Sequence, residues 1–146
     1  TDISPVALEI AVENAVRHGV QGLVSFLAGS WLEPVRRTPV RPLVCAVVSN
    51  PPYIPSGLID SLARDVRDFE PREALDGGLD GLEAVRKLAP AAYEALAEGG
   101  LLAMEIGDDQ SSRVEAILEG GGWARMAVVR DLAGLNRVVT AQKGPQ

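Results

Sequence analysis

The stretch with the clearest chemistry reads VVSNPPYIPS and covers residues 47–56. Asn50 offers a side-chain carbonyl oxygen, Pro51 offers a backbone carbonyl, and Tyr53 offers a flat aromatic face. Two acceptors beside a face can hold a planar NH₂ group by both of its hydrogens. Pro51 and Pro52 each fix their own φ and push the preceding residue away from helical angles, so the turn is stiff. We call residues 50–53 the Asn-Pro-Pro-Tyr turn.

A second interpretation of this turn is a proline-stiffened loop without a ligand, which is what a generic Asn-Pro-Pro sequence favours. The position of the turn supports the functional interpretation. It directly follows the apolar run LVCAVVS (residues 43–49), which is typical of a parallel strand covered on both faces. Ligands of such sheets bind at the carboxyl ends of the strands, where Asn50 would lie.

Other chemistries have weaker support. Cys45 is the single cysteine and lies in an apolar run, so we interpret it as a small buried hydrophobe in a reducing, cytoplasmic compartment. His18 lies beside the C-terminal end of an expected helix, where we expect a capping role, and Asp108 with Asp109 forms an expected solvated helix start. One histidine and one cysteine predict no metal site. No apolar run reaches membrane-spanning length, so we predict no membrane partner.

The elements that must position the turn alternate between helices and strands. This alternation predicts an α/β fold with a parallel, doubly wound sheet, and two consecutive C-terminal strands predict an antiparallel hairpin at its edge. Ser4 and Pro5 favour the first helix start, Gly19 fits the position just past its end, and Gly99-Gly100 favours the end of a later helix. The expected helices are 4–20, 82–100 (started anew or kinked at Pro90) and 111–122; the strands are 23–29, 43–49, 101–107, 124–134 and 136–142; the loops are 34–42 and the long ordered loop 55–81.

Four segments together resemble a known family, and they occur in the family's order: SNPPYIP, DVRDFEPREALDGGLDGL, LLAMEIG and DLAGLNRVV. They are similar to the release-factor glutamine methyltransferases (the HemK/PrmC family), which are class I, S-adenosylmethionine-dependent enzymes. The resemblance covers residues 1–146 and implies a Rossmann-like fold, with the chain as the C-terminal portion of the catalytic domain and 55–81 as a substrate-side loop. It implies methyl transfer to the side-chain amide nitrogen of the glutamine in the Gly-Gly-Gln motif of a peptide-chain release factor.

The resemblance also assigns roles to residues. Asp2 corresponds to the acidic residue that binds the cofactor ribose, and Trp31 to the aromatic residue against the adenine. Asn50 corresponds to a residue that is catalytic and also contacts the cofactor. The resemblance implies that Asn50, Pro51, Pro52 and Tyr53 together form the clamp that binds the substrate amide. Without the resemblance, Asp2 is a loop aspartate before a helix cap and Trp31 is a packing residue. We expect structural roles for Glu70 and Glu105.

Two departures from the family pattern lead to further expectations. Ser30 stands where the family commonly has an aspartate, which puts a contact to the adenine amino group in doubt. The family's G-x-G-x-G loop and its first strand fall upstream of Thr1. By the family's strand order, that strand lies between the one ending at Asp2 and the one ending at Ser49. We therefore predict that the chain is a piece of a longer protein and that it is unstable and inactive alone.

Two rival functions remain. An adenine-N6 nucleic-acid methyltransferase can use the same turn to hold an exocyclic NH₂ group, but it needs basic surface around its site. The net charge of −6 and the scattered basic residues argue against a stable nucleic-acid partner. The other rival is a non-catalytic methyltransferase-like domain that binds a partner, which the absence of the glycine-rich loop favours.

Overall fold

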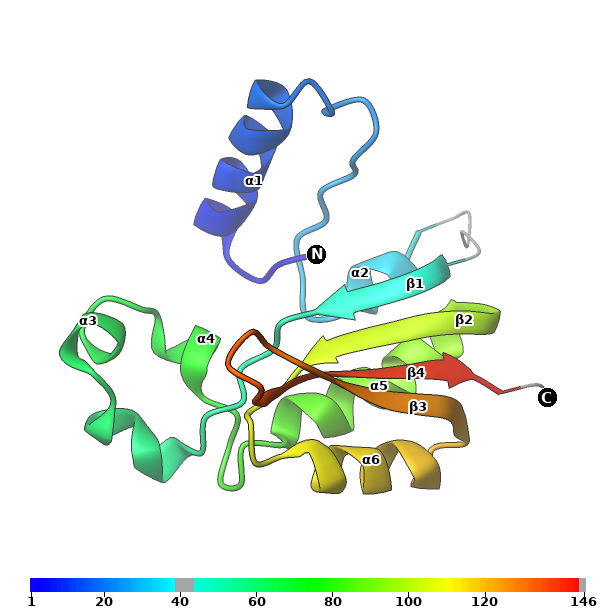
Figure 1. Cartoon of the computed structure of the whole chain (residues 1–146). Coiled ribbons are helices and arrows are strands. Elements are labelled where there is room, and N and C mark those ends of the chain that lie inside the picture. The colour runs from blue at the N-terminus through cyan, green and yellow to red at the C-terminus, as the bar shows by residue number, and fades with distance from the viewer. Residues whose placement is uncertain (39–43, 145–146) are drawn as a thin grey trace. The chain divides into compact units, whose positions relative to one another are not determined.

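The computed structural model describes residues 1–38 and 44–144. The chain forms two compact units, Thr1–Leu43 and Val44–Gln146. Figure 1 shows the helices of the first unit and the mixed sheet with its helices in the second.

The first unit begins with helix α1, Pro5–Arg17. Ser4 Oγ accepts a hydrogen bond from the backbone N–H of Ala7 at 3.2 Å, and Pro5 occupies the first turn. Gly19 follows the helix with a φ of +67°, a conformation that glycine adopts without strain. The predicted start and stop of this helix are confirmed.

The strand predicted at 23–29 is wrong. A single bridge pairs Asp2 with Ala28, with backbone bonds from Asp2 N to the Leu27 carbonyl at 3.3 Å and from Gly29 N to the Asp2 carbonyl at 2.9 Å. The pairing cannot lengthen toward Ser4, because the chain enters helix α1 there. The predicted loop 34–42 overlaps the one-turn helix α2, Glu33–Arg36, and its residues 39–42 lie outside the described residues.

The second unit is built on a four-stranded sheet. Its strands are β1 (Val44–Ser49), β2 (Leu96–Glu105), β3 (Trp123–Arg130) and β4 (Asn136–Lys143), in the order β1-β2-β4-β3. Strand β1 runs parallel to β2, whereas β4 is antiparallel to both β2 and β3. The predicted C-terminal antiparallel hairpin is therefore confirmed, and β3 forms the edge.

Helices α5 (Glu83–Ala95) and α6 (Ser111–Gly120) pack against each other and cover one face of this sheet, as Figure 1 shows. The row Val47, Leu102 and Ala141 crosses three neighbouring strands and is buried. The core is therefore the layer between this sheet face and the two helices. Its largest fully buried apolar side chains are Leu82, Val85, Leu102, Met104, Ile106, Val114, Leu118 and Val139.

The prediction that 43–49 is covered on both faces is wrong for the described part, 44–49. Val47 is 6% exposed but its neighbour Val48 is 79% exposed, because α5 and α6 lie on the same side of the sheet. Cys45 is exposed as well, which contradicts its interpretation as a buried hydrophobe. It lies between Val44 and Ala46, where the pairing register with β2 shifts.

The predicted helix end at Gly99-Gly100 is also wrong. Helix α5 stops at Ala95, and both glycines belong to β2, which begins at Leu96. Gly99 has a φ of +73°, which lets the strand make the irregularity opposite the Val44–Ala46 register shift. Pro90 lies inside α5, which continues through it as one helix.

The segment predicted as the long ordered loop 55–81 contains three short helices: η1 (Ser56–Ser61), α3 (Arg64–Arg67) and α4 (Arg72–Leu75). The longest has six residues, so the glycines and prolines do prevent an extended helix, as predicted. The segment returns to its start, because Ile54 forms a bridge with Asp76.

Candidate functional site at the carboxyl end of β1

The Asn-Pro-Pro-Tyr turn directly follows Ser49, the last residue of β1. Because β1 and β2 are parallel, their carboxyl ends lie at the same edge of the sheet, as Figure 1 shows. Asn50 is exposed, Pro51 is buried, and Tyr53 is half-buried. The structure thus anchors the turn while it leaves the Asn50 side chain open to a ligand.

The Tyr53 hydroxyl is held by the end of the neighbouring strand. It donates a hydrogen bond to Glu105 Oε1 at 3.3 Å, and Glu105 is the last residue of β2. Burial raises the pKa of Tyr53, and the charge of Glu105 raises it further, while Arg137 acts in the opposite direction. Tyr53 therefore remains a neutral donor at neutral pH. This contact gives Glu105 a structural role of the kind expected from the sequence.

The Tyr53 carbonyl is held by a residue that the sequence did not single out. Gln110 Nε2 donates to this carbonyl at 2.8 Å and to the Gly81 carbonyl at 3.3 Å. Gln110 Oε1 accepts from the backbone N–H of Gly107 at 2.9 Å. The signal that could have drawn attention to it is its position just before α6, where Ser, Asp, Asn or Thr would be the usual cap.

The segment after the turn closes back on it through backbone bonds. Ile54 N donates to the Leu75 carbonyl at 3.0 Å, and Gly77 N donates to the Ile54 carbonyl at 2.8 Å. The Asp76 carboxylate accepts from the Ser56 hydroxyl at 2.6 Å and from Gly78 N at 3.0 Å. The bond from Ser56 is the largest cause that lowers the pKa of Asp76, and the bond from Gly78 lowers it further. The ordered segment therefore braces the turn from its C-terminal side.

Two glycines permit this close approach. A Cβ at Gly77 would come within 2.9 Å of the Pro52 carbonyl oxygen. A Cβ at Gly81 would collide with the Tyr53 carbonyl oxygen, and Gly81 also has a φ of +74°. Both positions therefore require glycine, and both glycines lie in the DGGLDG part of the sequence.

The two residues assigned to the cofactor by resemblance belong to the first unit, whereas the Asn-Pro-Pro-Tyr turn belongs to the second. Asp2 is exposed, and its Oδ1 accepts from the backbone N–H of Ser4 at 2.8 Å. Trp31 is half-buried with a φ of +50°, and its carbonyl accepts from the Thr1 hydroxyl at 2.6 Å. Positive φ is rare for such a bulky residue, so the local fold imposes this backbone conformation.

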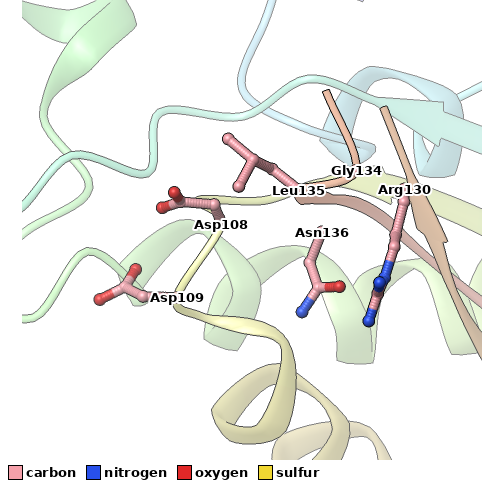
Figure 2. Close-up of a pocket in the computed structure, with 6 residues that line it drawn as sticks. All are labelled: Asp108, Asp109, Arg130, Gly134, Leu135 and Asn136. Carbon is pink, nitrogen blue, oxygen red and sulfur yellow. The ribbon is translucent and has the colours of Figure 1, made fainter. Parts of the chain in front are cut away.

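A shallow pocket of about 270 Å³ lies between the start of α6 and the β3–β4 turn, and Figure 2 shows its lining. Asp108 and Asp109 are exposed there, as predicted for a solvated helix start. Asn136 donates to the Ser111 hydroxyl at 3.0 Å. The lining does not include the Asn-Pro-Pro-Tyr turn; it consists of Asp108, Asp109, Arg130, Gly134, Leu135 and Asn136.

Within residues 1–38 and 44–144, no group of three or more His, Cys, Asp or Glu side chains could hold a metal ion. No helix in the same part of the chain is long and apolar enough to span a bilayer.

Solved structures define the class of fold. A methyltransferase from Pyrococcus furiosus matches 98% of this chain and 60% of its own, with a TM-score of 0.65 and 16% identity. An S-adenosylmethionine-dependent methyltransferase in its apo form matches 99% of this chain and 43% of its own, with a TM-score of 0.60 and 14% identity. The fold is therefore that of the Rossmann-like methyltransferases, as predicted.

Sequence comparison finds curated relatives that share one name. No family model matches the chain. The release factor glutamine methyltransferase of Caulobacter vibrioides is 44% identical over 144 residues, which is 99% of this chain and 48% of the relative. That of Moorella thermoacetica is 45% identical over 144 residues, 98% of this chain and 49% of the relative. The chain is therefore similar to release factor glutamine methyltransferases over nearly all of its own length, and it spans about half the length of these curated relatives.

Proposed function

We propose that the protein carrying this chain transfers a methyl group from S-adenosylmethionine to a glutamine side-chain amide nitrogen. The glutamine is that of the Gly-Gly-Gln motif in a peptide-chain release factor, and the reaction takes place in the cytoplasm. The observation that carries the proposal is the Asn-Pro-Pro-Tyr turn at the carboxyl end of β1, held there by Glu105 and Gln110 in a chain 44% identical to enzymes named for this reaction.

The residues of the first unit fit the cofactor by their chemistry. The exposed carboxylate of Asp2 uses Oδ1 for the Ser4 N–H and has further lone pairs with which to accept two ribose hydroxyls. Trp31 offers an aromatic ring suited to an adenine. When bound, S-adenosylmethionine supplies an electrophilic methyl group. Ser30, which precedes Trp31 in the sequence, replaces the family's aspartate. The first unit therefore offers one carboxylate fewer to the adenine amino group.

The Asn-Pro-Pro-Tyr turn has the task of orienting a poor nucleophile. An amide nitrogen shares its lone pair with the carbonyl, so position matters more than proton removal. The Asn50 side-chain oxygen and the Pro51 carbonyl accept the two amide hydrogens, and Tyr53 packs against the glutamine and excludes water. The stiffness given by Pro51 and Pro52 means that little reorganisation is needed when substrate binds.

The charge of the chain favours a protein substrate over a nucleic acid. An enzyme that holds an exposed base needs a basic surface for the phosphates. Here the net charge is −6, and the arginines of segment 64–72 lie among acidic residues. Arg64 and Arg67 both pair with Asp68, and Arg72 pairs with Asp76.

The test is single-turnover methyl transfer by the full-length protein that carries this chain, with release factor, RNA and DNA offered as separate acceptors. Asn50→Ala should lower transfer to release-factor glutamine by about 100-fold or more, because the amide loses an acceptor that aligns it. Calorimetric titration should show S-adenosylmethionine affinity close to that of the wild type. Asn14→Ala, at an exposed asparagine of α1, is the matched control and should leave the rate unchanged.

Two outcomes would contradict the proposal. Transfer to RNA or DNA, but not to release factor, would identify an adenine-type methyltransferase. A folded wild-type protein that does not bind S-adenosylmethionine would identify a non-catalytic binding domain. Equal losses of cofactor binding and turnover in Asn50→Ala would contradict the assignment of Asn50 to substrate alignment.

A further inference from the structure

Gln110 joins three separate segments of the second unit through one buried amide. The residue is 2% exposed, although glutamine is usually a surface residue. It contacts Tyr53 in the turn after β1, Gly81 before α5, and Gly107 after β2. A buried polar side chain of this kind needs every partner that it has, since each lost bond leaves a desolvated group.

The bonding capacity of this amide is matched to its partners. The two N–H donors of Gln110 go to two backbone carbonyls, and the carbonyl oxygen accepts from the Gly107 N–H. The orientation of the amide follows from these partners, because a backbone N–H only donates and a backbone carbonyl only accepts. The side chain makes no capping bond to α6, although Gln110 occupies the cap position. It is therefore directed away from its own helix and toward the Asn-Pro-Pro-Tyr turn.

We propose that Gln110 is a positioning residue for the methyl-transfer site. By holding the Tyr53 carbonyl, it sets where the Asn-Pro-Pro-Tyr turn lies relative to the β2–α6 connection and so orients Asn50. The expected effect of Gln110 on the rate of methyl transfer rests on the proposed function. The claim that Gln110 holds the Asn-Pro-Pro-Tyr turn in place is structural and does not depend on that function. The two claims can be tested separately.

A glutamine amide satisfies this arrangement, whereas a glutamate does not. A glutamate of the same length would keep an acceptor for Gly107 N but would place a carboxylate oxygen against the Tyr53 and Gly81 carbonyls. The surrounding space is fitted to the side chain, because a Cβ at Gly81 would come within 2.6 Å of Gln110 Nε2 and one at Gly107 within 3.1 Å of its Cδ. Gln110→Glu is therefore a near-isosteric change that removes the two donated bonds.

The kinetic test compares Gln110→Glu with Val114→Ala in the full-length protein, below the melting temperature of both. Val114 is 0% exposed, lies one turn further along α6 and contacts none of these carbonyls through hydrogen bonds, so it controls for general destabilisation of the helix. We expect Gln110→Glu to lower kcat by about 10- to 100-fold with S-adenosylmethionine affinity retained. Val114→Ala should lower the melting temperature and leave kcat within about twofold.

The structural test is amide hydrogen exchange on the same two variants, and it does not depend on activity. In Gln110→Glu, Ile54 N–H and Gly77 N–H should exchange about tenfold faster, because they bond within the segment that the lost contacts hold. Gly107 N–H should stay protected, because glutamate still offers it an acceptor. In Val114→Ala, no selective change at Ile54 or Gly77 is expected.

The outcomes separate the two claims. Selective exchange at Ile54 and Gly77 together with a selective loss of kcat supports the positioning role. Exchange that rises uniformly, or a kcat that falls only as much as in Val114→Ala, overturns it. A wild-type protein inactive on release factor contradicts the proposed function, and the exchange pattern then still decides whether Gln110 holds the turn.

Discussion

The hydroxyl of Tyr53 and the carboxylate of Glu105 meet at 3.3 Å although the two residues are 52 positions apart in the sequence. This bond connects the turn after β1 to the last residue of β2, so it links the two parallel strands at their carboxyl ends. Arg137 is close enough for its charge to act on Tyr53, and it also pairs with Asp131 at 3.3 Å. The tyrosine hydroxyl therefore interacts with charged groups from two neighbouring strands, β2 and β4.

Tyr53 should ionise above the ordinary tyrosine pKa. The chain has two tyrosines, so Tyr93→Phe leaves Tyr53 as the only one in the described chain, and its tyrosinate absorbance should rise above pH 10.0. The folded pKa lies above the unfolded value, so the contribution of Tyr53 to stability is full below pH 10.0 and is lost as the pH rises through the folded pKa. Adding Glu105→Gln should move the titration down, but not fully to 10.0, because burial is the largest cause of the shift. Titration at or below 10.0 in Tyr93→Phe would contradict the bonded geometry.

Asp80 should support stability in mild acid. Two hydrogen bonds from Arg86 lower the pKa of Asp80 from 3.8 to about 2. The folded pKa lies below the unfolded value, so the stabilisation is present above pH 3.8 and is lost as the pH falls through about 2. The melting temperature of Asp80→Asn should therefore lie below that of the wild type near neutral pH, with the gap closing on acidification through this window.

Gly81→Ala should destabilise the second unit by about 1–3 kcal/mol or more, because a non-glycine residue at positive φ is strained. The added Cβ also collides with the Tyr53 carbonyl. Gly57→Ala is the matched control, since its Cβ would meet nothing within 4 Å, and it should change the free energy of unfolding by less than about 0.5 kcal/mol. Urea denaturation of both variants measures the difference. Equal effects would show that the close approach at Gly81 does not exist in solution.

Leu102→Ala and Leu101→Ala make the same chemical change at adjacent positions of β2. Leu102 is 0% exposed beneath the helices, so its truncation should cost about 2–5 kcal/mol of unfolding free energy. Leu101 is 38% exposed on the opposite face, so its truncation should cost about 1 kcal/mol. The same denaturation experiment measures both. A larger loss at Leu101 would mean that the covered face of the sheet has been assigned incorrectly.

Local chemistry in the sequence was sufficient for several elements. Ser4 and Pro5 define the start of α1, because capping depends on residues only three positions apart. The β3–β4 hairpin is similarly local, since Asp131 accepts from Ala133 N and Leu135 N within its own turn. The Asn-Pro-Pro-Tyr turn was located for the same reason, because proline restricts the backbone whatever surrounds it.

The wrong predictions share one cause. Apolar content suggested a strand at 23–29 and a strand buried on both faces at 43–49, but strand formation and burial depend on partners that the local pattern does not reveal. Residues 23–29 pair only at Ala28, and β1 is covered on one face because α5 and α6 lie on the same side. Gly99 was expected to end a helix. It instead lies in β2, opposite the place near Cys45 where the pairing of β1 with β2 shifts register.

The sequence by itself determined where the turn lies and which groups it presents, because those properties come from Asn50, the two prolines and Tyr53. Only the tertiary structure decided what holds the turn. Gln110 lies 57 positions from Tyr53 in the sequence, and Glu105 lies 52 positions from it. Hydrogen bonds between such distant residues depend on how strands and helices assemble. Buried polar groups must find partners wherever the fold brings them, and no local pattern in the sequence specifies that place.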